Sequence, residues 1–237
     1  MISIIIPAYN RGYVIGRTLQ SIAKQTYRDF EVIIVDDGST DNTADVIRNV
    51  CNNWKEEVTL IDQKNQGAPS ARNKGFKYSR GEYVLFCDAD LILKNTCLAK
   101  MRLTLDNNPD KSYAYCSFKY GFKTFTSLDF DAEKLKRINY ISTTSLIRRE
   151  HFPGFDESLK KFQDWDLWLT MLEQGHTGVR IKEILFKAIL CKDGISAWLP
   201  SFAYKIPWKK FGVHIPAIER YEKWKTIVQE KHNIQKF

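Results

Sequence analysis

Two pairs of carboxylates stand out in the first ninety residues, because each pair directly follows an apolar run that predicts a buried strand. Asp36 and Asp37 form the first pair, and Asp88 and Asp90 form the second. The carboxyl ends of parallel strands meet at one edge of a sheet, where such acids repel one another unless a cation or hydrogen-bond donors answer them. Two positions apart on an extended segment, Asp88 and Asp90 would point the same way and could share Mg²⁺ or Mn²⁺ with phosphate oxygens.

Each pair also has a structural alternative. An Asp-x-Asp sequence is common in surface turns, and after Asp37 the residue Gly38 suits a tight turn while one of residues 39–41 could cap the next helix. Capping does not account for Asp36 or Asp37, whose carboxylates could accept hydrogen bonds from a nucleobase or a ribose.

A third polar cluster, residues 65–75, opens a predicted helix and places Arg72 and Lys74 near its start. A helix N-terminus and basic side chains both favour anions, so this cluster could hold a pyrophosphate. The alternative is a solvent-exposed basic helix face.

Strands and helices alternate through the first ninety residues and bring these clusters to one edge. Near-continuous apolar runs predict strands that are buried on both faces of a parallel sheet, and apolar residues at helical spacing predict the connecting helices. The alternation indicates right-handed βαβ units in an open α/β sheet. The predicted strands are 3–7, 31–35, 58–61 and 83–87, and the predicted helices are 14–22, 44–51 and 69–78.

Beyond residue 90 the pattern is looser, and one soft boundary lies near Gly194. We therefore expect a catalytic domain over 1–193, with halves at 1–90 and 91–193, followed by an extension over 194–237. The predicted helices of the second half are about 98–105 and 165–174, and its predicted strands are 113–118, 143–148 and 179–190.

Length and composition exclude several classes of protein. The chain has 237 residues, 43% hydrophobic and 27% charged, which is typical of one large globular domain and excludes a disordered or collagen-like chain. No apolar run approaches the ~18–20 residues of a membrane span, and we expect no secretory leader. Five cysteines without a Cys-x-x-Cys pair favour a reducing cytoplasm. The absence of Gly-x-Gly, a P-loop and His-Glu-x-x-His excludes dehydrogenase, P-loop and zincin chemistry.

Half of the net charge of +8 lies in residues 193–237, where eight Lys or Arg outnumber four Asp or Glu and aromatic residues are frequent. Within this tail, the apolar residues of 216–232 fall near one helical face. One interpretation is that this face packs on the catalytic domain. The other places the stretch 198–211 on the anionic inner face of a membrane, where a peripheral cytoplasmic enzyme would meet lipid-linked acceptors.

Taken together, the motifs of residues 1–190 resemble those of family 2 glycosyltransferases with the GT-A fold, in the same order and spacing. They are Ile-Ile-Pro-Ala-Tyr-Asn at 5–10, Val-Asp-Asp-Gly-Ser-Thr-Asp at 35–41, Asn-Gln-Gly and Ala-Arg-Asn-Lys-Gly within 65–75, Asp-Ala-Asp at 88–90 and Gln-Asp-Trp-Asp-Leu-Trp-Leu at 163–169. The resemblance implies a Rossmann-like, mostly parallel central sheet flanked by helices. It also implies inverting transfer of one sugar from a nucleotide donor, often a UDP-sugar, with Mg²⁺ or Mn²⁺. The processive synthases of the family have a Gln-x-x-Arg-Trp element and membrane helices, which this sequence lacks, so a non-processive enzyme is expected.

The resemblance also implies roles for the residues that match the family motifs. It implies a donor site of Pro7, Ala8, Tyr9, Arg11, Asp36, Asp37, Arg72, Asp88 and Ala89, a metal site of Asp90 and Asp88, acceptor contacts at Gln163 and Trp165, and a catalytic base at Asp164. An inverting displacement needs a carboxylate that takes the proton of the acceptor hydroxyl. Asp166 faces roughly 200° away from Asp164 on a helix, so only one of the two can enter a cleft. The family commonly has Glu-Asp at this position, so Gln163 removes one negative charge beside Asp164. The structural alternative to a catalytic base at Asp164 is a helix N-cap.

We therefore expect a hexosyltransferase that moves a sugar to a glycan or lipid-linked acceptor in cell-surface polysaccharide synthesis, without a nucleic-acid partner. Two alternatives stay open. A sugar nucleotidyltransferase would need a Gly-rich, Lys- or Arg-bearing loop after the first strand, and a non-catalytic nucleic-acid- or membrane-binding protein on the same scaffold would not need the intact carboxylates. Acceptor selection would fall to residues 119–142 and the tail, where no motif is found.

Overall fold

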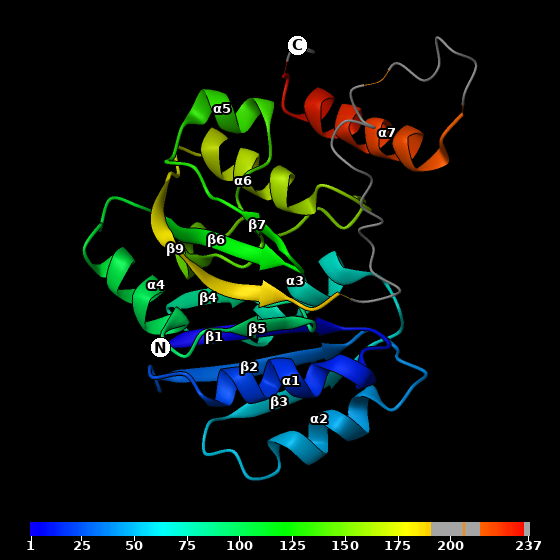
Figure 1. Ribbon diagram of the computed structural model, residues 1–237, viewed down its shortest axis with the longest axis vertical. Helices are drawn as coiled ribbons and strands as arrows, with labels where there is room; N and C mark the ends of the chain where they lie inside the picture. Colours follow the sequence, from blue (N-terminus) through cyan, green and yellow to red (C-terminus); the bar gives the residue numbers. More distant parts are fainter. Residues whose placement is uncertain (191–205, 207–213, 235–237) are drawn as a thin grey trace.

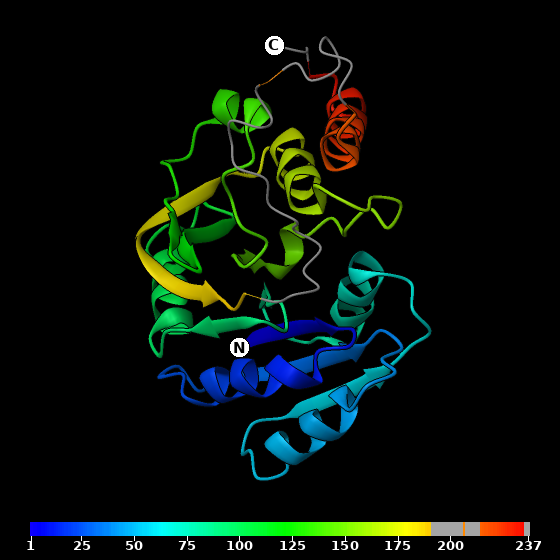
Figure 2. The ribbon, with the colours of Figure 1, turned by 45° about the vertical axis from the view of Figure 1, so that its right-hand side comes forward.

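The computed structural model describes residues 1–190, 206 and 214–234, and it contains a nine-stranded sheet with helices on both faces (Figures 1 and 2). The strand order is β3-β2-β1-β4-β8-β6-β9-β5, with β7 paired to β6. The strands are β1 (Ile2–Ala8), β2 (Phe30–Asp36), β3 (Val58–Asp62), β4 (Tyr83–Phe86), β5 (Leu91–Leu93), β6 (Tyr113–Tyr120), β7 (Lys123–Phe125), β8 (Leu146–Arg148) and β9 (Gly178–Ala188). The helices are α1 (Gly12–Ala23), α2 (Thr43–Cys51), α3 (Ala68–Tyr78), α4 (Cys97–Asp106), α5 (Ala132–Arg137), a short 3-10 helix (Arg149–His151), α6 (Gln163–Glu173) and α7 (Pro216–Lys231).

The first half of the sheet is parallel, as predicted. Strands β3, β2, β1 and β4 form three parallel ladders, and most paired residues of the whole sheet lie in parallel ladders. Past β4 the pairing is mixed, because β8 is antiparallel to both β4 and β6 whereas β9 is parallel to β6. The β6–β9 ladder shifts register on either side of Ser117, and β9 curves across the sheet to reach β5 (Figure 1).

The near-continuous apolar character of β1 follows from a core on each face of the sheet. Ile4 and Ile6 pack with residues of α1, α2 and α4, whereas Ile5 packs on the other face with residues of α3 and α6. Helix α3 lies close against β1 at Gly75, where an added Cβ would be 2.5 Å from Cγ2 of Ile5. This close approach fixes the position of Arg72, one turn earlier on the same helix.

Helix α7 packs on the domain through its apolar face, which confirms the first interpretation of residues 216–232. Val228 is fully buried in the core that contains α6, and the ring of Tyr221 lies 5.0 Å from that of Phe162. Both views show α7 beside α6 (Figures 1 and 2). The predicted boundary near Gly194 and the stretch 198–211, Ile206 apart, lie outside the described residues.

Ion pairs hold the last turn of α7. The Lys231 Nζ lies 2.7 Å from Asp156 Oδ2, and the His232 Nε2 lies 2.9 Å from Asp166 Oδ1. Of the helices in the described ranges, none combines the length and the apolar character needed to cross a membrane.

Candidate active site

At the carboxyl end of β2, Asp37 is buried and shapes the loop before α3. Its Oδ1 accepts hydrogen bonds from Gln63 Nε2 at 2.7 Å and from the Gln66 amide at 2.8 Å. Its Oδ2 accepts one from the Gly67 amide at 2.8 Å, and Gly67 adopts a left-handed φ of 90° that favours glycine. Both oxygens of Asp37 therefore anchor the loop from which α3 begins.

Asn10 cross-links the loops that follow β1 and β2. It has a left-handed φ of 50°, its amide donates to Ser39 Oγ at 2.9 Å, and its Oδ1 accepts from the Thr40 amide at 2.8 Å. The carboxylate of Asp36 accepts a hydrogen bond from the Ser39 amide at 2.8 Å. Asn10 belongs to the motif at 5–10, but no role was predicted for it.

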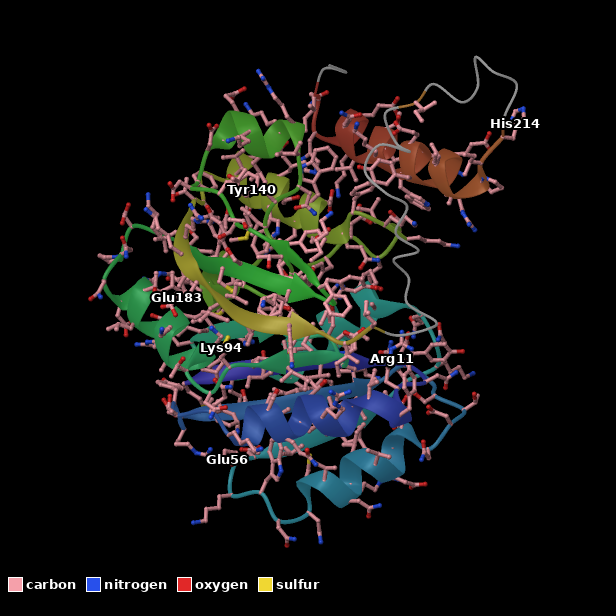
Figure 3. All side chains as sticks on the ribbon, viewed as in Figure 1. Arg11, Glu56, Lys94, Tyr140, Glu183 and His214 are labelled. Carbon is pink, nitrogen blue, oxygen red and sulfur yellow. The ribbon has the colours of Figure 1, made fainter. Side chains whose placement is uncertain are left out.

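The residues predicted on β1 lie along the same edge. Tyr9 exposes 45% of its surface, whereas Ala8 is buried and Pro7 is half-buried. Figure 3 labels Arg11 at this edge, and its amide donates to Thr43 Oγ1 at 2.8 Å. We call the group Pro7–Arg11, Asp36 and Asp37 the β1–β2 edge, and the fold brings its members together as predicted.

The segment after β4 is a turn, and the prediction that it is extended was wrong. The amide of Leu91 donates to the carbonyl of Asp88 at 3.3 Å and closes the turn before β5. Ala89 is buried, and its carbonyl accepts a hydrogen bond from Thr18 Oγ1 at 2.7 Å. Because the segment is a turn, the alternation of side chains along a strand does not predict the directions of Asp88 and Asp90. Both side chains nevertheless line one cavity.

Arg72 joins this turn to α6. Its Nη2 donates to Asp88 Oδ1 at 2.7 Å, and its Nη1 donates to Gln163 Oε1 at 2.9 Å. The side chain of Arg72 is 8% exposed and that of Asp88 is 44% exposed, and the guanidinium carbon lies 5.2 Å from the ring centroid of Phe155. A buried cation thus orients a carboxylate that solvent still reaches.

Asp164 is the second residue of α6, so the alternative that it caps the helix was wrong. The N-cap residue is Phe162, which has a left-handed φ of 59°. Burial raises the pKa of Asp164 above its ordinary value, although a hydrogen bond with Asn139 and the charge of Arg72 oppose the shift. Asp166 instead faces α7, where His232 binds it.

The wall of a cavity of about 790 Å³ includes residues of the turn after β4 and of α6. Asp88, Asp90, Asp164 and Trp165 line it, whereas Gln163 is directed to Arg72 and is not part of its lining. The residues of the β1–β2 edge are also not among the described lining residues. The candidate site therefore has two parts, the β1–β2 edge and this carboxylate cavity.

Sequence reasoning missed several residues of the cavity wall. Arg137, Asn139 and Tyr140 belong to the segment at and after the end of α5, and Tyr221 and Lys225 belong to α7. Figure 3 labels Tyr140 on the same side of the sheet as α5 and α6. No motif covers these residues individually, although all of them fall within residues 119–142 and the tail, the two regions to which acceptor selection was assigned.

Asp88 and Asp90 fit a divalent cation that takes its other ligands from phosphates. Arg72 donates to Oδ1 of Asp88, the Asp88 side chain is 44% exposed, and Asp90 lines the same cavity. Mg²⁺ and Mn²⁺ are commonly bound by one or two carboxylates together with substrate phosphates. In the parts of the chain that the structure describes, no group of three or more His, Cys, Asp or Glu could hold a metal ion.

Solved structures show the same fold at low sequence identity. The structure of Staphylococcus aureus TarS 1–349 with UDP-GlcNAc has a TM-score of 0.72 and 23% identity, over 86% of this chain and 63% of that chain. The mannosyltransferase PcManGT of Pyrobaculum calidifontis, in complex with GDP-Man and Mn²⁺, has a TM-score of 0.67 and 21% identity, over 82% of this chain and 58% of that chain. These similarities confirm the predicted GT-A fold.

Sequence relatives identify the family. A Haemophilus influenzae protein named as an uncharacterized glycosyltransferase is 33% identical over 188 residues, 73% of this chain and 72% of the relative. The chondroitin synthase of Pasteurella multocida is 31% identical over 213 residues, 83% of this chain and 21% of the relative. The chain spans 28% of the length of a further relative, an uncharacterized glycosyltransferase of Rickettsia bellii that is 27% identical over 206 residues, 77% of this chain. The model of glycosyl transferase family 2 matches residues 3–159, and the chain belongs to this family.

Proposed function

We propose that this chain is a metal-dependent, inverting transferase that moves one sugar from a UDP-sugar to a glycan or lipid-linked acceptor. The observation that carries the proposal is a single cavity lined by Asp88, Asp90 and Asp164, beside an edge of loops that follow parallel strands. Ligands of open α/β sheets bind at such an edge.

The β1–β2 edge would hold the nucleoside of the donor. The half-exposed ring of Tyr9 offers a surface for a base, and Asp36 and Arg11 lie in the loops beside it. Asp37 would act through the loop that it anchors at Gln66 and Gly67. The UDP-GlcNAc and GDP-Man in the structures of TarS and PcManGT support a nucleotide-sugar donor.

Asp90 and Asp88 would hold Mg²⁺ or Mn²⁺ next to the donor diphosphate. The chemistry that this ion supplies is neutralisation of the charge on the departing diphosphate. The Mn²⁺ in PcManGT supports this assignment. Arg72 keeps Asp88 oriented, and because Arg72 also binds Gln163 it couples the position of Asp88 to the start of α6.

Asp164 would accept the proton of the acceptor hydroxyl as the hydroxyl oxygen bonds to the anomeric carbon and the bond to the diphosphate breaks. Its partial burial raises its pKa, which makes it a stronger base than an exposed aspartate. Its Oδ1 accepts the Trp165 amide at 2.9 Å, and the Asn139 side chain binds it as well, so the carboxylate is oriented. Gln163 is directed to Arg72, and Trp165 is 2% exposed with its Nε1 donating to the Leu135 carbonyl, so the acceptor would contact other residues of the cavity wall.

A glycan acceptor is supported by the cavity and by the relatives. Tyr140 and Tyr221 are among the aromatic side chains that line the cavity, and aromatic rings suit the apolar faces of sugars. The similarity to the chondroitin synthase of Pasteurella multocida supports a role in polysaccharide synthesis.

A donor panel tests this function. UDP-, GDP- and dTDP-sugars are added with Mn²⁺, and thermal stabilisation and slow hydrolysis of each donor are measured. We expect a UDP-sugar to stabilise the protein and to be hydrolysed, and we expect EDTA to remove both effects. If no donor has either effect, and a nucleoside triphosphate with a sugar phosphate is consumed instead, the chain is a nucleotidyltransferase. If nothing binds or reacts, the scaffold is not catalytic.

A further inference from the structure

Charge is divided between two sets of elements around the carboxylate cavity. The described Lys and Arg side chains of its lining are Lys123 on β7, Arg137 at the end of α5 and Lys225 on α7. Its described carboxylates come instead from the turn after β4 and from α6. We call Lys123, Arg137 and Lys225 the basic group. All three line one cavity although they are far apart in the sequence.

Stacked aromatic rings line the same cavity. The ring of Phe118 lies parallel to that of Phe125, with centroids 4.8 Å apart, and parallel to that of Phe186, with centroids 5.2 Å apart. The Lys123 Nζ is 4.9 Å from the centroid of the Phe125 ring. The cavity therefore presents aromatic surface next to positive charge, a combination that suits a sugar ring with a charged substituent.

The position of the basic group favours the acceptor over the donor. In the proposed function the nucleoside lies at the β1–β2 edge, whose residues are not among the described cavity lining, and the diphosphate lies at Asp88 and Asp90. The basic group comes from β7, α5 and α7, all of which follow residue 90, whereas Asp88 and Asp90 follow β4 (Figure 1). A donor sugar beside Asp164 would not occupy the part of the cavity that the basic group lines. That part would be open to the acceptor.

We propose that the acceptor is an anionic saccharide, whose carboxylate or phosphate binds Lys225, Lys123 and Arg137 while its ring packs on the aromatic wall. This inference rests on the proposed function. All three side chains bring positive charge to one cavity, so each attracts an anion that binds there. Guanidinium and ammonium groups are also the side chains that bind carboxylates and phosphates most strongly.

Docking of α7 delivers Lys225 to the acceptor. The helix is fixed on one end by Tyr221 against Phe162, two residues before Asp164, and on the other end by His232 against Asp166. Lys225 lies between these anchors and is half-buried, so its position is set relative to the helix that carries the base. Lys225 is therefore a specificity-determining residue.

The test uses the full chain with UDP and Mn²⁺ at saturation and three probes of equal length. Tetragalacturonate carries carboxylates, a glycerol phosphate tetramer carries phosphates, and maltotetraose is neutral. In calorimetric titrations we expect one anionic probe to bind about tenfold more tightly than maltotetraose, with an affinity that falls as salt is added. The anionic probe that binds identifies the charged group of the acceptor.

Variants of α7 assign the effect to the basic group. We expect Lys225→Gln to weaken the anionic probe by about tenfold and to leave UDP affinity unchanged, and Lys225→Arg to keep the preference. Lys223→Gln, an exposed lysine outside the cavity on the same helix, should leave the probe affinity unchanged.

Three results would overturn the inference. They are equal binding of maltotetraose and the anionic probes, no binding of either anionic probe by the wild-type chain, and a loss of UDP affinity in Lys225→Gln with no change for the probe. The last result would place the basic group on the donor. If UDP itself does not bind the wild-type chain, the proposed function fails instead, so the two failures are distinguishable.

Discussion

The two parts of the site hold their carboxylates in different ways. At the β1–β2 edge, Asp36 and Asp37 accept hydrogen bonds from three backbone amides of the following loops, and Asp37 accepts one more from the Gln63 side chain. In the carboxylate cavity, Asp88 is held by the Arg72 side chain, and Asp164 is bound by a side chain as well as by one amide. Backbone donors are fixed by the fold, whereas side-chain donors can reorient when a ligand changes the local charge. The edge therefore relies mainly on backbone donors, which we call the platform, and the cavity relies more on side chains.

The largest effect is expected from removing a carboxylate of the cavity. In the Asp90→Ala variant we expect metal-dependent UDP affinity to fall by more than roughly 100-fold, because even residues that only support a metal ligand contribute up to that amount. Calorimetric titration of UDP with Mn²⁺, repeated in EDTA, measures the change. Asp62→Ala removes an exposed carboxylate at the end of β3 and should bind UDP like the wild type. If the wild type binds UDP equally well in EDTA and in Mn²⁺, donor binding does not depend on a metal.

Loss of Asp37 should instead act on the platform. We expect Asp37→Ala to lower the free energy of unfolding by about 2–4 kcal/mol, because the Gln63 side chain and the amides of Gln66 and Gly67 lose their acceptor. Urea unfolding measures this change. The exposed control Asp62→Ala should change it by less than about 0.5 kcal/mol. A variant of Asp37 that is as stable as this control would show that the loop does not depend on the carboxylate.

A smaller, pH-dependent effect is expected where α7 docks beside the cavity. Burial alone lowers the pKa of His232, but hydrogen bonds to Asp166 and Glu173 outweigh it and raise the pKa above its ordinary value. Lys231 also binds Asp166, and Lys136 of α5 lines the adjoining cavity. Because the folded pKa of His232 is raised, its contacts with Asp166 and Glu173 stabilise the folded state by about 1 kcal/mol at pH values below its unfolded pKa. This stabilisation is lost as the pH rises through the folded pKa.

Urea unfolding midpoints, measured from below the unfolded pKa of His232 to above its raised folded pKa, test whether the charge of His232 holds α7 in place. We expect His232→Gln to flatten the dependence, whereas His214→Gln, a change at the exposed histidine labelled in Figure 3, should retain it. If the wild type and His232→Gln show the same pH dependence, the docking of α7 does not depend on the charge of His232.

The first half of the fold followed from the sequence because its strands are apolar on both faces. Ile4 and Ile5 pack into different cores, so β1 appears as an unbroken apolar run that is bounded by a polar motif. The turn at Asp88 was not predicted, because spacing alone does not distinguish an extended segment from a turn. Asn139 and Lys225 could not be predicted, since they reach the cavity through tertiary packing of α5, α6 and α7 and belong to no motif.

Turnover of the Asp164→Asn variant tests the role of the cavity most directly. Donor hydrolysis uses water as the acceptor, so it can be measured with the UDP-sugar that stabilises the wild type most. We predict that turnover falls roughly 10²–10⁴-fold while UDP affinity is unchanged, because the substitution removes a base and no donor ligand. Wild-type turnover should also fall as the pH drops through the raised pKa of Asp164, which must be deprotonated to act. An Asp164→Asn variant that binds UDP and hydrolyses the donor as fast as the wild type would contradict the account.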